Sequence, residues 1–107
     1  MKLPSYRYKI TVVRVIDGDT LECDVDLGFY TRIRTKLRLL GINCPETDSP
    51  EGREAKMFTQ GKADGLSLTA ETHRADKYGN RWNAVVFLPD GTSLNDLLVA
   101  AGHAKPV

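Results

Sequence analysis

The chain has 107 residues, of which 41% are hydrophobic, and it carries 15 Lys and Arg against 14 Asp and Glu, for a net charge of +1. This length predicts one domain with a single small core. The near balance of charge excludes a general polycation, so any affinity for nucleic acid must come from basic side chains that the fold gathers locally.

No segment of the sequence has the features of a signal peptide or a membrane span. The N-terminal residues MKLPSYRYK lack the apolar stretch and cleavage site of a secretory signal, and no apolar run approaches the length that a membrane helix needs. The 2 cysteines, Cys23 and Cys44, lack metal-site spacing and are too few for a disulfide framework. We therefore expect free, mostly buried thiols in a cytoplasmic protein that does not associate with membranes.

The first part of the chain predicts three strands. Residues Tyr6 to Ile16 are rich in β-branched and aromatic side chains, and Asp17-Gly18 then favours a turn. Apolar and charged residues alternate over Leu21 to Leu27 and again over Ile33 to Leu39. These two runs predict an antiparallel hairpin that turns around Gly28-Phe29-Tyr30.

With the turn at Gly28-Phe29-Tyr30, the alternation also sets the register of this hairpin, because a one-residue slip would turn every side chain to the opposite face. The inward positions are Leu21, Cys23, Val25 and Leu27 on the first strand and Ile33, Thr35, Leu37 and Leu39 on the second. The outward pairs are Asp26 with Arg32, Asp24 with Arg34, and Glu22 with Lys36. The same register places Thr20 beside Arg38, which leaves Arg38 without an acidic partner.

The middle of the chain predicts a helix. Ser49 offers a capping hydroxyl, Pro50 suits the first turn, and Glu51 lies near the positive end of the helix dipole. The helix is expected to run to about Asp64. Its inward face is predicted to comprise Ala55, Phe58 and the aliphatic stem of Lys62.

The remaining residues predict two strands and a last helix. The alternating pattern favours strands over Leu66 to Thr72 and Arg81 to Leu88. Ser93 and Asp96 form a capping box at the start of the final helix. For the single domain of residues 1–107, these elements predict an α+β fold: a five-stranded Greek-key barrel with two helices and antiparallel strand connections.

Polar residues that a small core does not need occur in three separated segments. They are VIDGDT at 15–20, RLLGINCPE at 38–46 and DKYG at 76–79. Asp19, Asn43 and the backbone carbonyl of Cys44 are hard oxygen donors of the kind that calcium prefers. Taken alone, Asp-Gly-Asp-Thr is better explained as the chemistry of a turn than as a metal site.

Two arginines and a glutamate complete this set. Arg38 and Arg81 could clamp a phosphate through paired guanidinium donors. Glu46, one residue after Pro45, could accept a proton or position a water molecule. The sequence therefore indicates a protein that hydrolyses or binds phosphodiesters.

Four segments in order, VVRVIDGDT, RLLGINCPE, ADKYG and LNDLLVAAGHA, resemble the staphylococcal nuclease (thermonuclease) family, and the resemblance extends from about Lys9 to Lys105. It implies a barrel of the OB type and a calcium-dependent endonuclease that acts on DNA and RNA and leaves 3′-phosphates. Nothing in the sequence looks like a helix that reads bases, so we expect sequence-tolerant action on single-stranded or flexible substrate.

The resemblance also implies a role for each site residue. Asp19, Asn43 and the Cys44 carbonyl would be calcium ligands, and Arg38, Glu46 and Arg81 would be catalytic. Lys77 and Tyr78 would contact the far phosphate and the base of the substrate. Asp17 and Thr20 would orient the ligands or bound water.

Two departures from the family pattern favour a different function. Asn43 stands where the family commonly has aspartate, and Asn80 is inserted between Gly79 and Arg81. The first weakens a calcium site, and the second displaces Arg81 unless the loop absorbs the extra residue. The alternative is thus a catalytically weak or inactive OB-type module that binds nucleic acid or protein.

Overall fold

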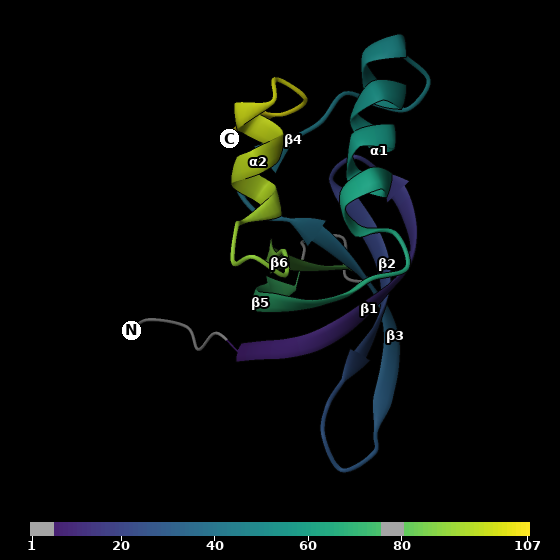
Figure 1. The fold of residues 1–107 in the computed structure, drawn as a ribbon, viewed down its shortest axis with the longest axis vertical. Helices are drawn as coiled ribbons and strands as arrows, with labels where there is room; N and C mark the ends of the chain where they lie inside the picture. Colours follow the sequence, from purple (N-terminus) through teal and green to yellow (C-terminus); the bar gives the residue numbers. More distant parts are fainter. Residues whose placement is uncertain (1–5, 76–80) are drawn as a thin grey trace.

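The computed structural model describes residues 6–75 and 81–107, and a closed five-stranded barrel forms its centre (Figure 1). The barrel strands are β1 (Tyr6–Asp17), β2 (Thr20–Asp26), β3 (Arg32–Leu39), β5 (Ser67–Ala75) and β6 (Arg81–Phe87), in the order β1-β2-β3-β6-β5. A small second sheet pairs β4 (Ile42–Asn43) with β7 (Lys105–Pro106). The helices α1 (Pro50–Ala63) and α2 (Leu94–Ala100) both lie at the end of the barrel opposite the β2–β3 turn. The architecture is the predicted α+β barrel of the OB type.

One neighbouring pair of strands is parallel, so the prediction of antiparallel connections throughout was wrong. β3 and β6 run in the same direction, with Lys36 beside Arg81 and Arg38 beside Asn83. Strand direction cannot alternate around a closed ring of five strands, because five is an odd number. At least one parallel pair is therefore required, and the long path through α1 and β5 supplies the crossover that such a pair needs.

The β2–β3 hairpin has the predicted register, but its end is not part of the core. The observed pairs are Thr20 with Arg38, Glu22 with Lys36, Asp24 with Arg34, and Asp26 with Arg32. Leu27 and Ile33, which were predicted to face inward, are 39% and 44% exposed. The hairpin extends beyond the barrel (Figure 1), so these two side chains have no opposite wall to pack against.

Helix α1 begins as predicted. The Ser49 hydroxyl accepts a hydrogen bond from the Gly52 N–H at 3.0 Å, and the helix ends one residue before the predicted position. Ala55 is fully buried, whereas Lys62, predicted to contribute its stem to the inward face, is exposed; its amino group lies 5.7 Å from the centroid of the Phe58 ring. Within residues 6–75 and 81–107, no helix has the length and apolar character needed to cross a membrane.

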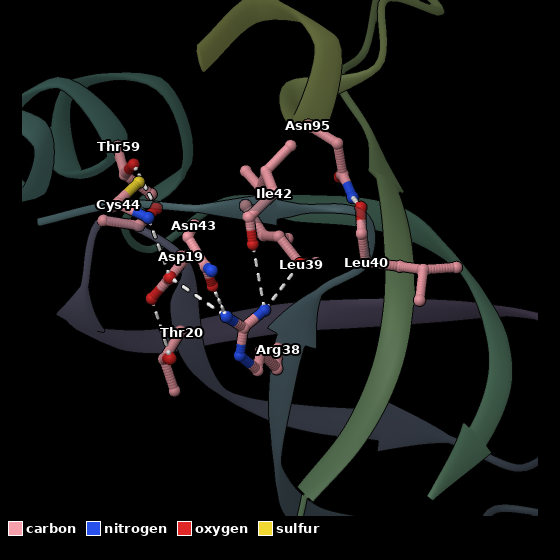
Figure 2. A network of polar contacts seen from close by, with 11 residues as sticks. Asp19, Thr20, Arg38, Leu39, Leu40, Ile42, Asn43, Cys44, Thr59 and Asn95 are labelled. Atoms are coloured by element: carbon pink, nitrogen blue, oxygen red, sulfur yellow. Dashed lines mark hydrogen bonds and ion pairs between the residues drawn. The ribbon is translucent and has the colours of Figure 1, made fainter. Parts of the chain in front are cut away.

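A buried amide that was not predicted connects α2 to the barrel. The Asn95 side chain donates to the carbonyls of Leu40 and Ala84 at 2.9 and 3.1 Å, and its oxygen accepts from the Val86 N–H at 3.1 Å. Three backbone groups thus lose water but keep hydrogen-bond partners. Because Leu40 directly follows β3, this contact also fixes the start of the loop that carries the candidate site (Figure 2).

Candidate active site

The candidate site lies where the β1–β2 turn meets the loop that follows β3. Helix α1 holds the turn closely: the Thr59 hydroxyl donates to the Gly18 carbonyl at 2.8 Å, and a Cβ on Gly18 would lie only 2.9 Å from the Cβ of Ala55. A residue larger than glycine would push the turn away from the helix. The next residue, Asp19, is therefore presented in a fixed position with 8% of its surface exposed.

The Asp19 carboxylate is hydrogen-bonded through both of its oxygens (Figure 2). Its Oδ2 accepts from the backbone N–H of Cys44 at 3.0 Å, and its Oδ1 accepts from the Thr20 hydroxyl at 3.2 Å. Its backbone carbonyl accepts from the Leu39 N–H at 2.8 Å. Two sequence segments, VIDGDT and RLLGINCPE, thus meet at one buried carboxylate.

The Arg38 guanidinium is fixed between Asp19 and the loop after β3. Its Nη1 donates to the carbonyls of Leu39 and Ile42 at 3.2 and 3.0 Å. Its Nη2 donates to the Asn43 amide oxygen and lies 3.6 Å from Oδ2 of Asp19. Figure 2 shows the guanidinium pointing toward both Asp19 and Asn43.

The prediction that Arg38 has no acidic partner was therefore wrong. The hairpin register gave only its cross-strand neighbour, Thr20, and this neighbour is correct. The loop reverses at Gly41, whose φ is +80°, and then pairs Asn43 with Lys105 in the small β4–β7 sheet. This reversal brings Asn43 back beside the guanidinium.

Cys23 and Cys44 are free thiols of low reactivity. Burial, with smaller contributions from Asp24 and Glu22, raises the pKa of Cys23 to about 12. Burial and the neighbouring Asp19 carboxylate together raise the pKa of Cys44 to about 12. The thiols therefore stay protonated at neutral pH and are poor nucleophiles. Cys44 contributes to the site through its backbone.

Glu46 lies in the exposed loop between β4 and α1. Its backbone carbonyl accepts from the Ser49 hydroxyl at 2.7 Å and from the Ser49 N–H at 3.1 Å. In the described part of the chain, no hydrogen bond or ion pair engages its carboxylate. The structure thus fixes the backbone of Glu46 and leaves its side chain accessible to solvent.

For Asp17 and Arg81, the structure gives positions in the barrel strands. Asp17 lies across the β1–β2 turn from Thr20. Arg81 begins β6, where its Cα lies beside Lys36 on β3. Lys77, Tyr78 and the Asn80 insertion lie outside the described residues. The structure joins Asp19, Thr20, Arg38, Asn43 and Cys44 in one network, and Glu46 is outside this network.

Thr59 supports the site but was not among the predicted residues. It is fully buried, and its hydroxyl bonds to the turn that carries Asp19. A threonine four residues after the inward-facing Ala55 falls on the same helix face. That spacing was the signal available in the sequence.

The donor set is of the type that suits calcium, although it is small. Asp19, Asn43 and the Cys44 carbonyl offer one carboxylate and two neutral oxygens, which are hard ligands. In residues 6–75 and 81–107, no group of three or more His, Cys, Asp or Glu gathers to hold a metal ion. A calcium ion here would rely on neutral donors and water, so these residues fit a weak site.

Comparison with known proteins confirms the family. The family model described as staphylococcal nuclease homologue matches residues 36–107. An "Uncharacterized endonuclease" of Escherichia coli O157:H7 is 34% identical over 93 residues, which cover 87% of this chain and 57% of that protein. A "Thermonuclease" of Staphylococcus hyicus is 33% identical over 102 residues, covering 88% and 56%. The chain spans about half the length of these curated relatives. Because the family model covers more than half of the chain, the chain belongs to the staphylococcal nuclease family.

Proposed function

We propose that this protein is a calcium-dependent endonuclease that hydrolyses phosphodiester bonds of DNA and RNA with little sequence preference and leaves 3′-phosphates. The observation that carries the proposal is the contact between the buried Asp19 carboxylate and the Arg38 guanidinium, in a chain of a nuclease family. Oδ2 of Asp19, which could bind a divalent ion, lies 3.6 Å from Nη2 of Arg38, which could bind a phosphate oxygen.

Arg38 would bind the phosphate that is cleaved. Its Nη1 is held by two loop carbonyls, whereas its Nη2 contacts the side chains of Asp19 and Asn43. A phosphate oxygen could replace the Asn43 amide at Nη2 without disturbing the carbonyl contacts. The guanidinium would then offset the negative charge that grows on the phosphoryl oxygens in the transition state.

Glu46 would hold the attacking water and accept its proton. The water oxygen bonds to phosphorus as the bond from phosphorus to the 5′-oxygen breaks. The 5′-oxygen takes a proton from solvent water, and Glu46 later returns the proton that it accepted to solvent. Asp19, Asn43 and the Cys44 carbonyl would hold calcium, which when bound supplies positive charge to a phosphate oxygen. The solvent-exposed loop position of Glu46 supports its assigned role, because a water molecule can reach it.

A binding module is the second candidate, and the Asn43 contact favours it. The amide at position 43 carries no charge, and its oxygen is already used by Arg38. A barrel of this type could retain nucleic acid without cleaving it.

Cleavage assays with and without calcium separate the two candidates. We expect single-stranded DNA and RNA to be cut in millimolar calcium, with 3′-phosphate products identified by mass, and we expect chelator to abolish cleavage. Binding of the same oligonucleotides without cleavage at any calcium concentration would instead establish the binding module.

Replacing Asn43 with Asp is expected to tighten calcium binding by roughly tenfold, because an ionised oxygen attracts a divalent ion more strongly than an amide dipole does. The gain is limited because the new carboxylate also attracts Arg38 in the metal-free protein. Calorimetric titration of calcium measures the effect. The control is Asn83→Asp, which adds the same charge beside Arg38 on the neighbouring strand. Equal tightening in both variants would show that position 43 is not a ligand.

A further inference from the structure

The β2–β3 hairpin ends in two aromatic rings that no described residue covers. Phe29 is 98% exposed and Tyr30 is 108% exposed. Both have left-handed backbone conformations, with φ of 55° and 61°, which residues other than glycine and asparagine rarely adopt. Burial in the barrel therefore does not account for the rings, and neither does turn chemistry.

A row of cations leads along β3 from this tip to the candidate active site. The outward positions of the strand are occupied by Arg32, Arg34, Lys36 and Arg38, at every second residue. At about 3.3 Å per residue, the row is about 20 Å long. It begins three residues after Phe29 and ends at the guanidinium that contacts Asp19.

Two of these cations have cross-strand positions opposite acids that are engaged elsewhere. Opposite Arg32, the Asp26 carboxylate accepts from the Gly28 N–H at 2.8 Å. Opposite Lys36, the Glu22 carboxylate pairs with Arg14 of β1 at 2.8 Å. Over residues 6–75 and 81–107, neither Arg32 nor Lys36 forms an ion pair. Both remain available to an external anion.

The tip and the first free cation also share a surface hollow. It is lined by Phe29 and Tyr30 together with Arg32, Asp26 and Gly28. Exposed rings bind flat, unpaired bases by stacking, and nearby cations bind the phosphates between those bases. A duplex would hide its bases from the rings, because paired bases are already stacked inside the helix. Single-stranded nucleic acid matches both the rings and the charge.

We propose that the β2–β3 hairpin is an arm that holds single-stranded DNA or RNA, with unpaired bases stacked on Phe29 and Tyr30 and phosphates contacted by Arg32 and Lys36. The arm would direct the strand toward Arg38 and would extend the grip on substrate well beyond the bond that is cut. This inference rests on the proposed nuclease function, since the arm serves a strand that reaches the Asp19–Arg38 site.

The test is the double variant Phe29→Asn/Tyr30→Gly, because Asn-Gly suits the left-handed turn and removes both rings. Binding of a fluorescein-labelled 20-nucleotide single strand is measured by anisotropy in chelator, which prevents calcium-dependent cleavage. We expect affinity to fall about tenfold or more, with no loss in the thermal unfolding midpoint. Cleavage of a dinucleotide in calcium is expected to match that of the parent, since it does not reach the tip. Tyr6→Ala, at an aromatic residue that is 57% exposed on β1, is the control and should bind as the parent does.

The outcomes separate this proposal from the proposed function. If the parent protein cleaves long single strands and the double variant binds them equally well, the arm is refuted and the nuclease function stands. If the parent neither binds nor cleaves, both fail. If the double variant changes only the sedimentation of the protein, the tip is a self-association surface and the arm is again refuted.

Arg32→Ala and Lys36→Ala should each lower the salt dependence of binding by about one phosphate contact.

Discussion

Replacing Glu46 with Gln is expected to lower the rate of phosphodiester cleavage by about a hundredfold or more, with little change in stability. Glutamine keeps the shape of the side chain and can still bond to water, but it cannot take the proton that the attacking water releases. Because the Glu46 side chain is exposed and forms no hydrogen bond or ion pair with the described residues, its replacement leaves no buried group unpaired.

The measurement is kcat on a single-stranded substrate at saturating calcium, together with thermal unfolding of both proteins. Glu54→Gln is the matched control, because Glu54 is also exposed, lies on nearby α1 and loses the same charge. We expect the control to cleave at the parental rate. A Glu46→Gln protein that cleaves as fast as the parent would remove Glu46 from the mechanism and leave the proton acceptor unassigned.

The alternation of side chains was sufficient to predict the hairpin but not the barrel around it. Strict alternation excludes slips by one residue, and together with the turn at Gly28-Phe29-Tyr30 it correctly placed Thr20 beside Arg38. The same pattern predicts which face of the strand each side chain is on, but it does not show how far the neighbouring barrel strands extend. This explains the errors at Leu27 and Ile33, which lie on the correct face but beyond the end of the barrel. The parallel β3–β6 pair follows from closure of the ring, which is a global property that no local pattern contains.

The residues that meet around Asp19 and Arg38 were named from the sequence, but most of their contacts were not. VIDGDT and RLLGINCPE supplied Asp19, Arg38 and Asn43, and the fold brings these three together. Their contacts depend on how the chain reverses after β3, and hydrophobic periodicity carries no information about loop direction. Asn95 was missed for a related reason. Its burial depends on hydrogen bonds to three backbone groups of the barrel, and the sequence does not show that these groups lie beside the helix.

The position of Glu46 depends on a close contact with the first turn of α1. Gly52 is buried in this turn, and a Cβ built on it would lie 1.7 Å from the carbonyl oxygen and 2.3 Å from the carbonyl carbon of Glu46. It would also lie 2.8 Å from the carbonyl oxygen of Pro45. These are backbone atoms, so no side chain can rotate away to make room. Only glycine allows the helix and the loop to approach this closely.

Replacing Gly52 with Ala is therefore expected to destabilise the protein by about 3 kcal/mol, because overpacking against backbone forces the helix and the loop apart. Cleavage should also fall in the fraction that remains folded, since the loop that moves carries Glu46. Gly61→Ala is the control on the same helix: its Cβ would meet no atom within 4 Å, and alanine should stabilise the helix by about 0.5–1 kcal/mol. Urea unfolding of the two variants measures opposite shifts in the free energy of unfolding.

If Gly52→Ala were as stable as the parent, α1 would not set the position of Glu46. If it were destabilised but cleaved normally once folded, the contact would serve folding alone, because catalysis would then not depend on where the first turn holds the loop.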